Sequence, residues 1–122
     1  MPVTTGIQKR TFDEPDETRA AGSGSSSIIN ASHIGLMQVT LPPGWKWSRD
    51  VKPLTHTESC QASHLVYMLS GRLHVKLEDG SEAEFGPTDV GMVPPGHDAW
   101  TLGEEPVVYL DITGSKVWAK PA

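Results

Sequence analysis

The chain has 122 residues, ten of them basic and fifteen acidic, so its formal net charge is −5. This length suits a single small globular domain with one hydrophobic core. The basic residues are scattered singly and form no stripe that could neutralise nucleic acid or an anionic membrane surface, so we expect neither partner. The longest apolar run, Leu65–Leu69, is too short to span a bilayer.

The N-terminus and the single cysteine bear on the compartment. The first ten residues contain no hydrophobic segment after a basic start, so no secretory signal is predicted. Cys60 is the only cysteine and cannot form an internal disulfide, which is typical of a reducing environment. We therefore predict a cytoplasmic protein.

The polarity of the chain divides it into two parts. Residues 1–27 are polar, and we predict that they form a partly flexible N-terminal arm in which Gly22–Ser27 is a mobile loop. Residues 28–122 carry the apolar runs and are predicted to form the folded domain. No helix is predicted in either part.

Twelve glycines and ten prolines separate short apolar runs, which is typical of an all-β chain. His64–Leu69 is apolar on both faces, as expected of a central strand covered on both sides. Arg72–Glu78 alternates between apolar and polar residues, and Asp79-Gly80 favours a hairpin after it. Further strands are predicted over His33–Leu41, Ala83–Phe85, Asp89–Val93, Asp98–Leu102 and Val107–Ile112. Seven or eight short antiparallel strands favour a sandwich or a barrel.

The turn at Ser70-Gly71 predicts which way the histidines face. If the flanking strands form a hairpin with a two-residue turn, His64 shares a face with the apolar residues of Arg72–Glu78, and His74 points outward; a three-residue turn would reverse both. The same alternation places His97 on the inner face of its own strand, together with every second residue that follows it. Two histidines are thus expected on the core face.

These histidines and the cysteine suggest a metal site. The Cys60 thiolate and the His64 imidazole can both bind Zn²⁺, and His97 would be the third ligand. Glu58 or Asp98 would be a fourth ligand or a base. The soft thiolate and the two imidazoles favour zinc over Mn²⁺ or Mg²⁺.

Structural roles for the same residues stay open. Cys60 can be a small buried hydrophobe, and His64 can simply hydrogen-bond inside the core. His97 and Asp98 can stabilise a local turn. Four aromatic side chains can wall a ligand pocket or pack in the core. They are Trp45, Trp47, Tyr67 and Trp100.

Several motifs between Pro42 and Asp111 resemble those of single-domain cupins. Pro43-Gly44 matches the opening of the first cupin motif, VYMLSG ending at Gly71 matches its end, and residues 89–96 (DVGMVPPG) match the second motif. PDETR at 15–19 and GHDAW at 96–100 resemble a subgroup of short cupins. The resemblance implies an antiparallel double-stranded β-helix, or jelly-roll, barrel.

The chain departs from the metal ligands that this resemblance implies. Residues 50–52 (DVK) stand where the first motif has His-x-His, His64 stands at the motif's glutamate, and Ala99 stands at the second motif's histidine. The resemblance therefore implies a rebuilt site with Cys60, His64 and His97.

Three functional hypotheses follow. The first is a small-molecule-binding barrel with a nonstandard divalent-metal site, which includes the possibility of a metal-dependent enzyme. The second is a metal-free ligand-binding or sensing module with its pocket in the barrel mouth. The third is a dimerisation module, because the outer face of Leu65–Leu69 needs a cover, and we expect a homodimer.

Overall fold

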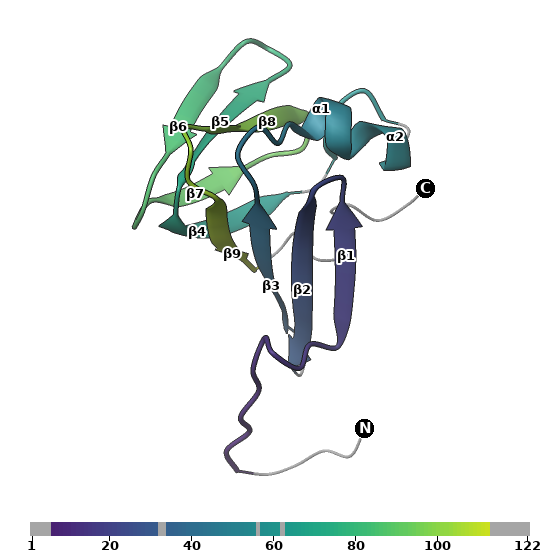
Figure 1. Cartoon of the computed structure of the whole chain (residues 1–122), viewed down its shortest axis with the longest axis vertical. Helices are drawn as coiled ribbons and strands as arrows, with labels where there is room; N and C mark the ends of the chain where they lie inside the picture. The colour runs from purple at the N-terminus through teal and green to yellow at the C-terminus, as the bar shows by residue number, and fades with distance from the viewer. Residues whose placement is uncertain (1–5, 32–33, 56, 62, 113–122) are drawn as a thin grey trace.

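The computed structural model describes residues 6–31, 34–55, 57–61 and 63–112, and it is an all-β jelly-roll barrel built from two antiparallel sheets (Figure 1). The larger sheet has the strand order β1-β2-β3-β9-β4-β7, and the smaller has β6-β5-β8. The strands are β1 (Glu17–Ala21), β2 (Gly24–Ala31), β3 (Ile34–Leu41), β4 (His64–Ser70), β5 (Arg72–Leu77), β6 (Glu82–Phe85), β7 (Val90–Val93), β8 (His97–Leu102) and β9 (Val107–Asp111). Two single-turn helices, α1 (Trp47–Asp50) and α2 (Lys52–Thr55), lie between β3 and β4.

The larger sheet begins within the polar N-terminal segment. β1 and β2 pair antiparallel around Gly22, whose φ of +61° suits a tight turn, and β2 continues through the serines to pair with β3. The prediction of a mobile loop at Gly22–Ser27 is therefore wrong. Backbone pairing accounts for the difference, because a strand with one solvent-facing side needs few apolar residues, and here Ile28 on the inner side joins the core.

β4 and β5 do not pair with each other, so the hairpin assumed from the sequence is wrong. β4 lies between β9 and β7, and β5 lies between β6 and β8. Gly71, with a φ of +76°, carries the chain from one sheet to the other. Alternation within each strand still turns His64 inward, so the facing prediction is right for a different reason.

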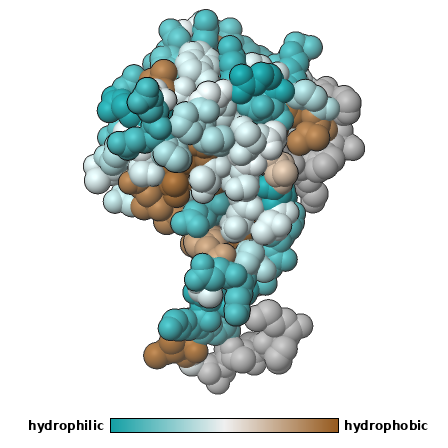
Figure 2. Space-filling view, viewed as in Figure 1, coloured by the Kyte–Doolittle hydropathy of each residue, from teal (hydrophilic) through white to brown (hydrophobic). Residues whose placement is uncertain are grey.

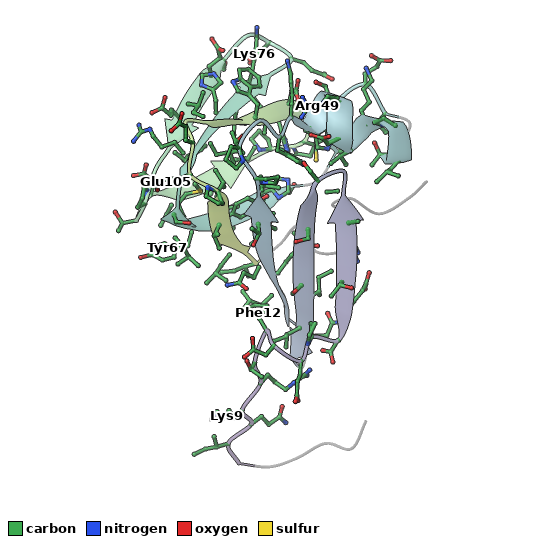
Figure 3. The ribbon with its side chains drawn as sticks, in the orientation of Figure 1. Lys9, Phe12, Arg49, Tyr67, Lys76 and Glu105 are labelled. Carbon is green, nitrogen blue, oxygen red and sulfur yellow. The ribbon has the colours of Figure 1, made fainter. Side chains whose placement is uncertain are left out.

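The two sheets enclose the core, but the outer face of β4 is open. Tyr67 and Leu69 are each 42% exposed, so the prediction that this strand is covered on both sides is wrong for the part of the chain that the structure describes. An apolar area interrupts the polar surface over this part of the large sheet (Figure 2). Tyr67 points away from the barrel (Figure 3).

None of the helices in the described residues is long and apolar enough to cross a membrane.

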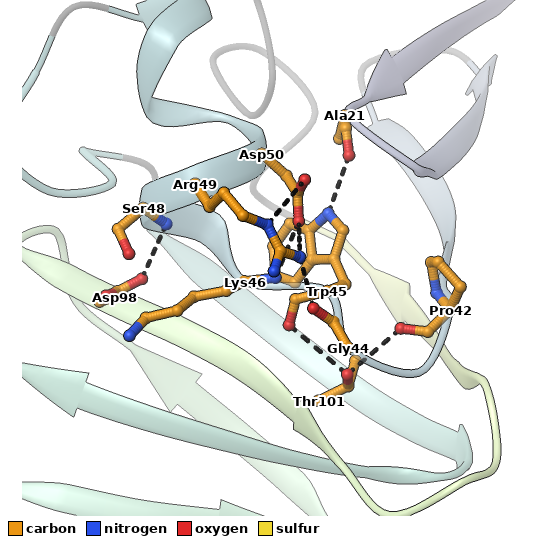
Figure 4. A network of polar contacts seen from close by, with 10 residues as sticks. All are labelled: Ala21, Pro42, Gly44, Trp45, Lys46, Ser48, Arg49, Asp50, Asp98 and Thr101. Carbon is orange, nitrogen blue, oxygen red and sulfur yellow. Dashed lines mark hydrogen bonds and ion pairs between the residues drawn. The ribbon is translucent and has the colours of Figure 1, made fainter.

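The segment between β3 and β4 is held by polar contacts and forms the two helices that the sequence did not predict (Figure 4). The Trp45 indole Nε1–H donates to the Ala21 carbonyl at 2.8 Å. Asp50 accepts a hydrogen bond from the Lys46 backbone N–H at 2.9 Å and pairs with Arg49. At the place where the cupin resemblance expects metal-binding histidines, this chain thus uses Asp50 to fix a turn.

Candidate metal centre

Three side chains with metal-binding donor atoms converge at one end of the barrel. Cys60 precedes β4, His64 is the first residue of β4, and His97 is the first residue of β8. The Cys60 backbone N–H donates to the His97 carbonyl at 2.8 Å, which joins the two segments. The thiol and imidazole donor atoms all lie within 4.8 Å of one another, and all three residues are buried.

His64 is oriented by a carboxylate that the sequence analysis missed. Its Nδ1 hydrogen-bonds Oδ2 of Asp111, the last residue of β9, which is wholly buried. This leaves Nε2 facing Cys60, 3.8 Å from Sγ. Alternation along β9 carried the missed signal, because Asp111 is a charged residue at an inward position of an otherwise apolar strand.

The tautomer of His97 follows from its partner. Nδ1 lies 2.7 Å from the Pro94 carbonyl oxygen, which can only accept a hydrogen bond, so Nδ1 carries the hydrogen. In the neutral ring Nε2 then carries a lone pair. The two imidazole rings lie edge to face with their centroids 5.0 Å apart.

The cluster favours charge separation. Burial raises the pKa of the Cys60 thiol, but hydrogen bonds with His64 and His97 outweigh burial and lower the pKa to about 6. Burial lowers the pKa of His64, but the hydrogen bonds with Asp111 and Cys60 outweigh it and raise the pKa to about 9. Near neutral pH, the cluster without a metal therefore holds a thiolate beside an imidazolium.

The donor set fits a tetrahedral divalent metal. Zinc bonds of ~2.0–2.3 Å place ligand atoms about 3.5 Å apart, so a small contraction of the cluster brings its donors into range. Both imidazoles are held through Nδ1 by an oxygen acceptor, as metal-binding histidines usually are. A thiolate with two imidazoles suits zinc better than a hard cation.

The two acidic candidates lie outside the cluster. The Glu58 side chain is 92% exposed and pairs with Lys52 at 3.1 Å. Asp98 points to the opposite face of β8 from His97 and accepts a hydrogen bond from the Ser48 backbone N–H at 3.1 Å (Figure 4). Within the described part of the chain, the cluster thus offers three ligands.

The four aromatic candidates divide between the inside and the outside of the barrel. Trp45 and Trp47 line a cavity of about 30 Å³ together with His64 and His97, which is room for roughly two water molecules. Trp100 is on the outer face of β8, stacked on His74 with ring centroids 4.6 Å apart. Tyr67 is on the outer face of the other sheet, so neither of these two rings lines that cavity.

Comparison with known proteins finds similarity in structure. No protein-family profile matches the sequence, and no curated protein sequence matches it either. A Rhizobium leguminosarum protein of unknown function superposes with a TM-score of 0.64 and 20% identity, over 97% of this chain and all of that one. A cupin-2 domain protein from Rhodospirillum rubrum superposes with a TM-score of 0.61 and 17% identity, over 91% of this chain and 76% of that one.

A larger protein contains a similar barrel. Oxalate decarboxylase from Lactobacillus farciminis, solved as a formate complex, matches 87% of this chain with a TM-score of 0.58 and 19% identity. The match covers 31% of that protein. At these identities the similarities show a shared fold.

Proposed function

The chain has the fold of the cupin superfamily, and on this basis we propose that it is a small-molecule-binding barrel with a nonstandard divalent-metal centre. Cys60, His64 and His97 would hold the metal. The observation that carries the proposal is the convergence of three buried donor atoms within 4.8 Å, with Nδ1 of both imidazoles already engaged. In the metal-free protein the His64 imidazolium balances the Cys60 thiolate, and a bound metal cation would take the place of that positive charge.

We propose zinc as the metal, on the softness of the donors. Three protein ligands leave one tetrahedral position for water or a ligand, which is the arrangement of catalytic zinc sites, whereas structural sites use four. A bound zinc ion would supply Lewis-acid polarisation to a ligand in that position. A metal-dependent enzyme is therefore the stronger form of the proposal, and its substrate would have to reach the small cavity beside His64 and His97.

The metal-free alternative has less support. A sensing module needs a pocket that encloses a metabolite, and pockets for drug-sized ligands are typically several hundred Å³. The cavity inside this barrel is about 30 Å³, and only Trp45 and Trp47 of the four predicted aromatic residues line it. Thermal-shift screening of metabolites in the presence of a chelator tests this alternative, and a ligand that stabilises the protein without metal would support it.

We also propose that the protein forms a homodimer through the outer face of β4 and β7. Tyr67 and Leu69 are 42% exposed, Val90 is 65% exposed and Met92 is 83% exposed, and these strands are neighbours in the sheet. Contiguous exposed apolar area of this kind marks an interaction surface in many proteins. Sedimentation velocity of the wild type and of Tyr67→Glu tests this, and a wild type that stays monomeric at all concentrations would contradict it.

Metal analysis tests the central proposal. Inductively coupled plasma mass spectrometry of untagged protein should find close to one zinc per chain. Cys60→Ser, His64→Ala and His97→Ala should each lose most of it. His74→Ala is the matched control, because this histidine faces away from the barrel interior. Equal metal content in all variants would refute the site.

The cytoplasmic location stays a prediction that cell fractionation would test.

A further inference from the structure

Strand β9 carries a second polar side chain into the barrel, two residues before Asp111. Tyr109 and Asp111 occupy alternate positions of this strand, so both face inward, and both are buried. Tyr109 is 4% exposed and lines the cavity that His64 and His97 also line. The strand that orients His64 through Asp111 thus also brings a phenol to the wall of the same cavity.

The Tyr109 hydroxyl has no hydrogen-bond partner within the described part of the chain. Two other buried polar side-chain atoms there lack a partner and are also fully enclosed, Ser26 Oγ and Trp47 Nε1, and the Tyr109 oxygen is not one of these. Because it has no partner and is not fully enclosed, the hydroxyl borders open space, and the cavity that Tyr109 lines supplies that space. Buried tyrosine hydroxyls usually have a partner, so this one is available to a molecule that enters the cavity.

The surroundings of Tyr109 keep it a hydrogen-bond donor and place it within electrostatic reach of the candidate metal centre. Burial is the largest cause that raises the pKa of Tyr109 well above its usual value, and the negative charges of Asp111 and Cys60 raise it further. Such a phenol stays protonated near neutral pH. It would therefore donate a hydrogen bond to a ligand instead of binding the metal as a phenolate.

The cavity sets the size of the molecule that Tyr109 can meet. Its volume of about 30 Å³ is room for roughly two water molecules, so a ligand that fills it contacts the polar groups on all its walls. Of the lining residues, only His64, His97, Tyr109 and two tryptophans carry polar side-chain atoms. The Trp45 indole N–H is already bonded, and that of Trp47 has almost no accessible surface. The Tyr109 hydroxyl is thus the polar group of this lining that can bind the ligand beside the two histidines.

We infer that Tyr109 is a ligand-binding residue of this cavity, whose hydroxyl donates a hydrogen bond to the molecule that would occupy the fourth position of the proposed metal. That molecule is a small hydrogen-bond acceptor of about three non-hydrogen atoms or fewer. The inference rests on the proposed metal centre for the position of the ligand. The role of Tyr109 itself is carried by its buried hydroxyl and by the cavity that it shares with the histidines.

Azide binding to the cobalt-loaded protein tests the inference. Azide is a linear triatomic anion that accepts hydrogen bonds, and its binding is followed by the visible absorption of Co²⁺. Tyr109→Phe should keep the cobalt and weaken azide binding roughly tenfold or more, because it removes a hydrogen bond to a charged acceptor. Tyr67→Phe is the matched control, because Tyr67 is the other tyrosine of the chain and lies on the outer face of the sheet. It should leave the azide affinity unchanged.

Two outcomes of this titration would overturn the inference. Equal azide affinities for the wild type and Tyr109→Phe would show that the hydroxyl does not contact the ligand. Loss of cobalt from a folded Tyr109→Phe variant would instead make Tyr109 a metal ligand.

Thermal unfolding of the metal-free protein separates ligand binding from a structural role. A hydroxyl without a protein partner contributes little to the fold, so Tyr109→Phe should unfold at the wild-type temperature or above it. Thr101→Val is the comparison, because it removes a buried hydroxyl that donates to the Pro42 carbonyl at 3.2 Å, and it should lower the unfolding temperature. A decrease in Tyr109→Phe as large as that in Thr101→Val would overturn the inference, because the hydroxyl would then have a partner in the protein.

Ala99→Val tests the size limit of the cavity. Ala99 lines the cavity together with His64 and His97, and the added methyl groups would fill most of the space. The variant should retain cobalt and should no longer bind azide. Azide binding with wild-type affinity in this variant would place the anion outside the cavity and overturn the inference.

Metal content separates the failure of this inference from the failure of the metal proposal. If cobalt binds and only the azide result fails, the metal centre stands and the role of Tyr109 falls. If the wild type takes up neither cobalt nor zinc, the metal centre is refuted, and azide is titrated against the metal-free protein by thermal shift. Stabilisation by azide that is lost in Tyr109→Phe would then still support the role of Tyr109. No stabilisation, or stabilisation that the variant keeps, would overturn it.

Discussion

Asp111→Asn should weaken metal binding at this site without removing any metal ligand. Asp111 is wholly buried, and its carboxylate holds Nδ1 of His64 so that Nε2 faces the cluster. Asparagine has nearly the same shape and can still accept the hydrogen bond, but it carries no charge. The substitution therefore changes the electrostatics of the site much more than its geometry.

The size of the effect can be bounded from the structure. The pKa of His64 is raised from 6.5 to about 9 against the opposing effect of burial, and Asp111 and Cys60 are the groups that raise it. The difference between these values corresponds to about 3 kcal/mol in favour of a positive charge on the ring. A cation bound at Nε2 feels the same carboxylate, and loss of such an outer partner usually weakens metal binding ~10–100-fold.

Competition with a chromogenic chelator measures this affinity, and pH decides how clearly the effect is seen. Below about pH 9 the metal must displace the proton of His64 in the wild type, so part of its advantage over the variant is masked. The ratio of the two affinities should therefore be largest above pH 9. Asp98→Asn is the matched control, because Asp98 binds backbone N–H groups away from the cluster. Equal zinc affinities for the wild type and Asp111→Asn above pH 9 would refute the reasoning.

Three further predictions concern the cysteine, the sheet crossing and the metal. In the metal-free protein, the ultraviolet absorbance of the Cys60 thiolate should appear on raising the pH, with a midpoint near pH 6. His64→Ala should move this midpoint to higher pH, because it removes a partner of the thiolate. An unchanged midpoint in the variant would contradict the thiolate–imidazolium pair. Gly71→Ala should destabilise the fold by at least about 2 kcal/mol in urea titration, because it combines a positive φ with a Cβ placed 2.5 Å from the Pro106 carbonyl oxygen. Gly80→Ala, at a positive φ in open space, should cost only about 1 kcal/mol, and similar costs for the two would argue against the steric explanation. Removal of zinc with a chelator should lower the unfolding temperature of the wild type and leave that of Cys60→Ser unchanged. The reason is that free zinc at a hundredfold excess over its Kd raises the free energy of unfolding of a protein that binds it by about 2.7 kcal/mol.

Features that depend on neighbours along the chain could be predicted. Strand alternation is a local property, so the sequence indicated the positions of most strands and the inward faces of His64 and His97. The recurrence of turn residues between short apolar runs indicated an all-β sandwich or barrel, and the resemblance to cupins implied that it is a jelly roll. The polar composition of β2 misled the same reasoning, since its strand character comes from pairing with β1 and β3.

Features that depend on contacts between distant segments were decided by the tertiary structure. Strand alternation alone does not show that β4 pairs with β9, and this pairing brings Asp111 to His64 across 47 residues. Nor does it show that β4 and β5 belong to different sheets, or that Trp45 and Trp47, which lie outside the strands, line one cavity with the two histidines. The alternation of apolar and polar residues along each strand therefore determined which residues face inward. The order in which distant strands pair determined which of those residues meet, because each such contact depends on two segments at once.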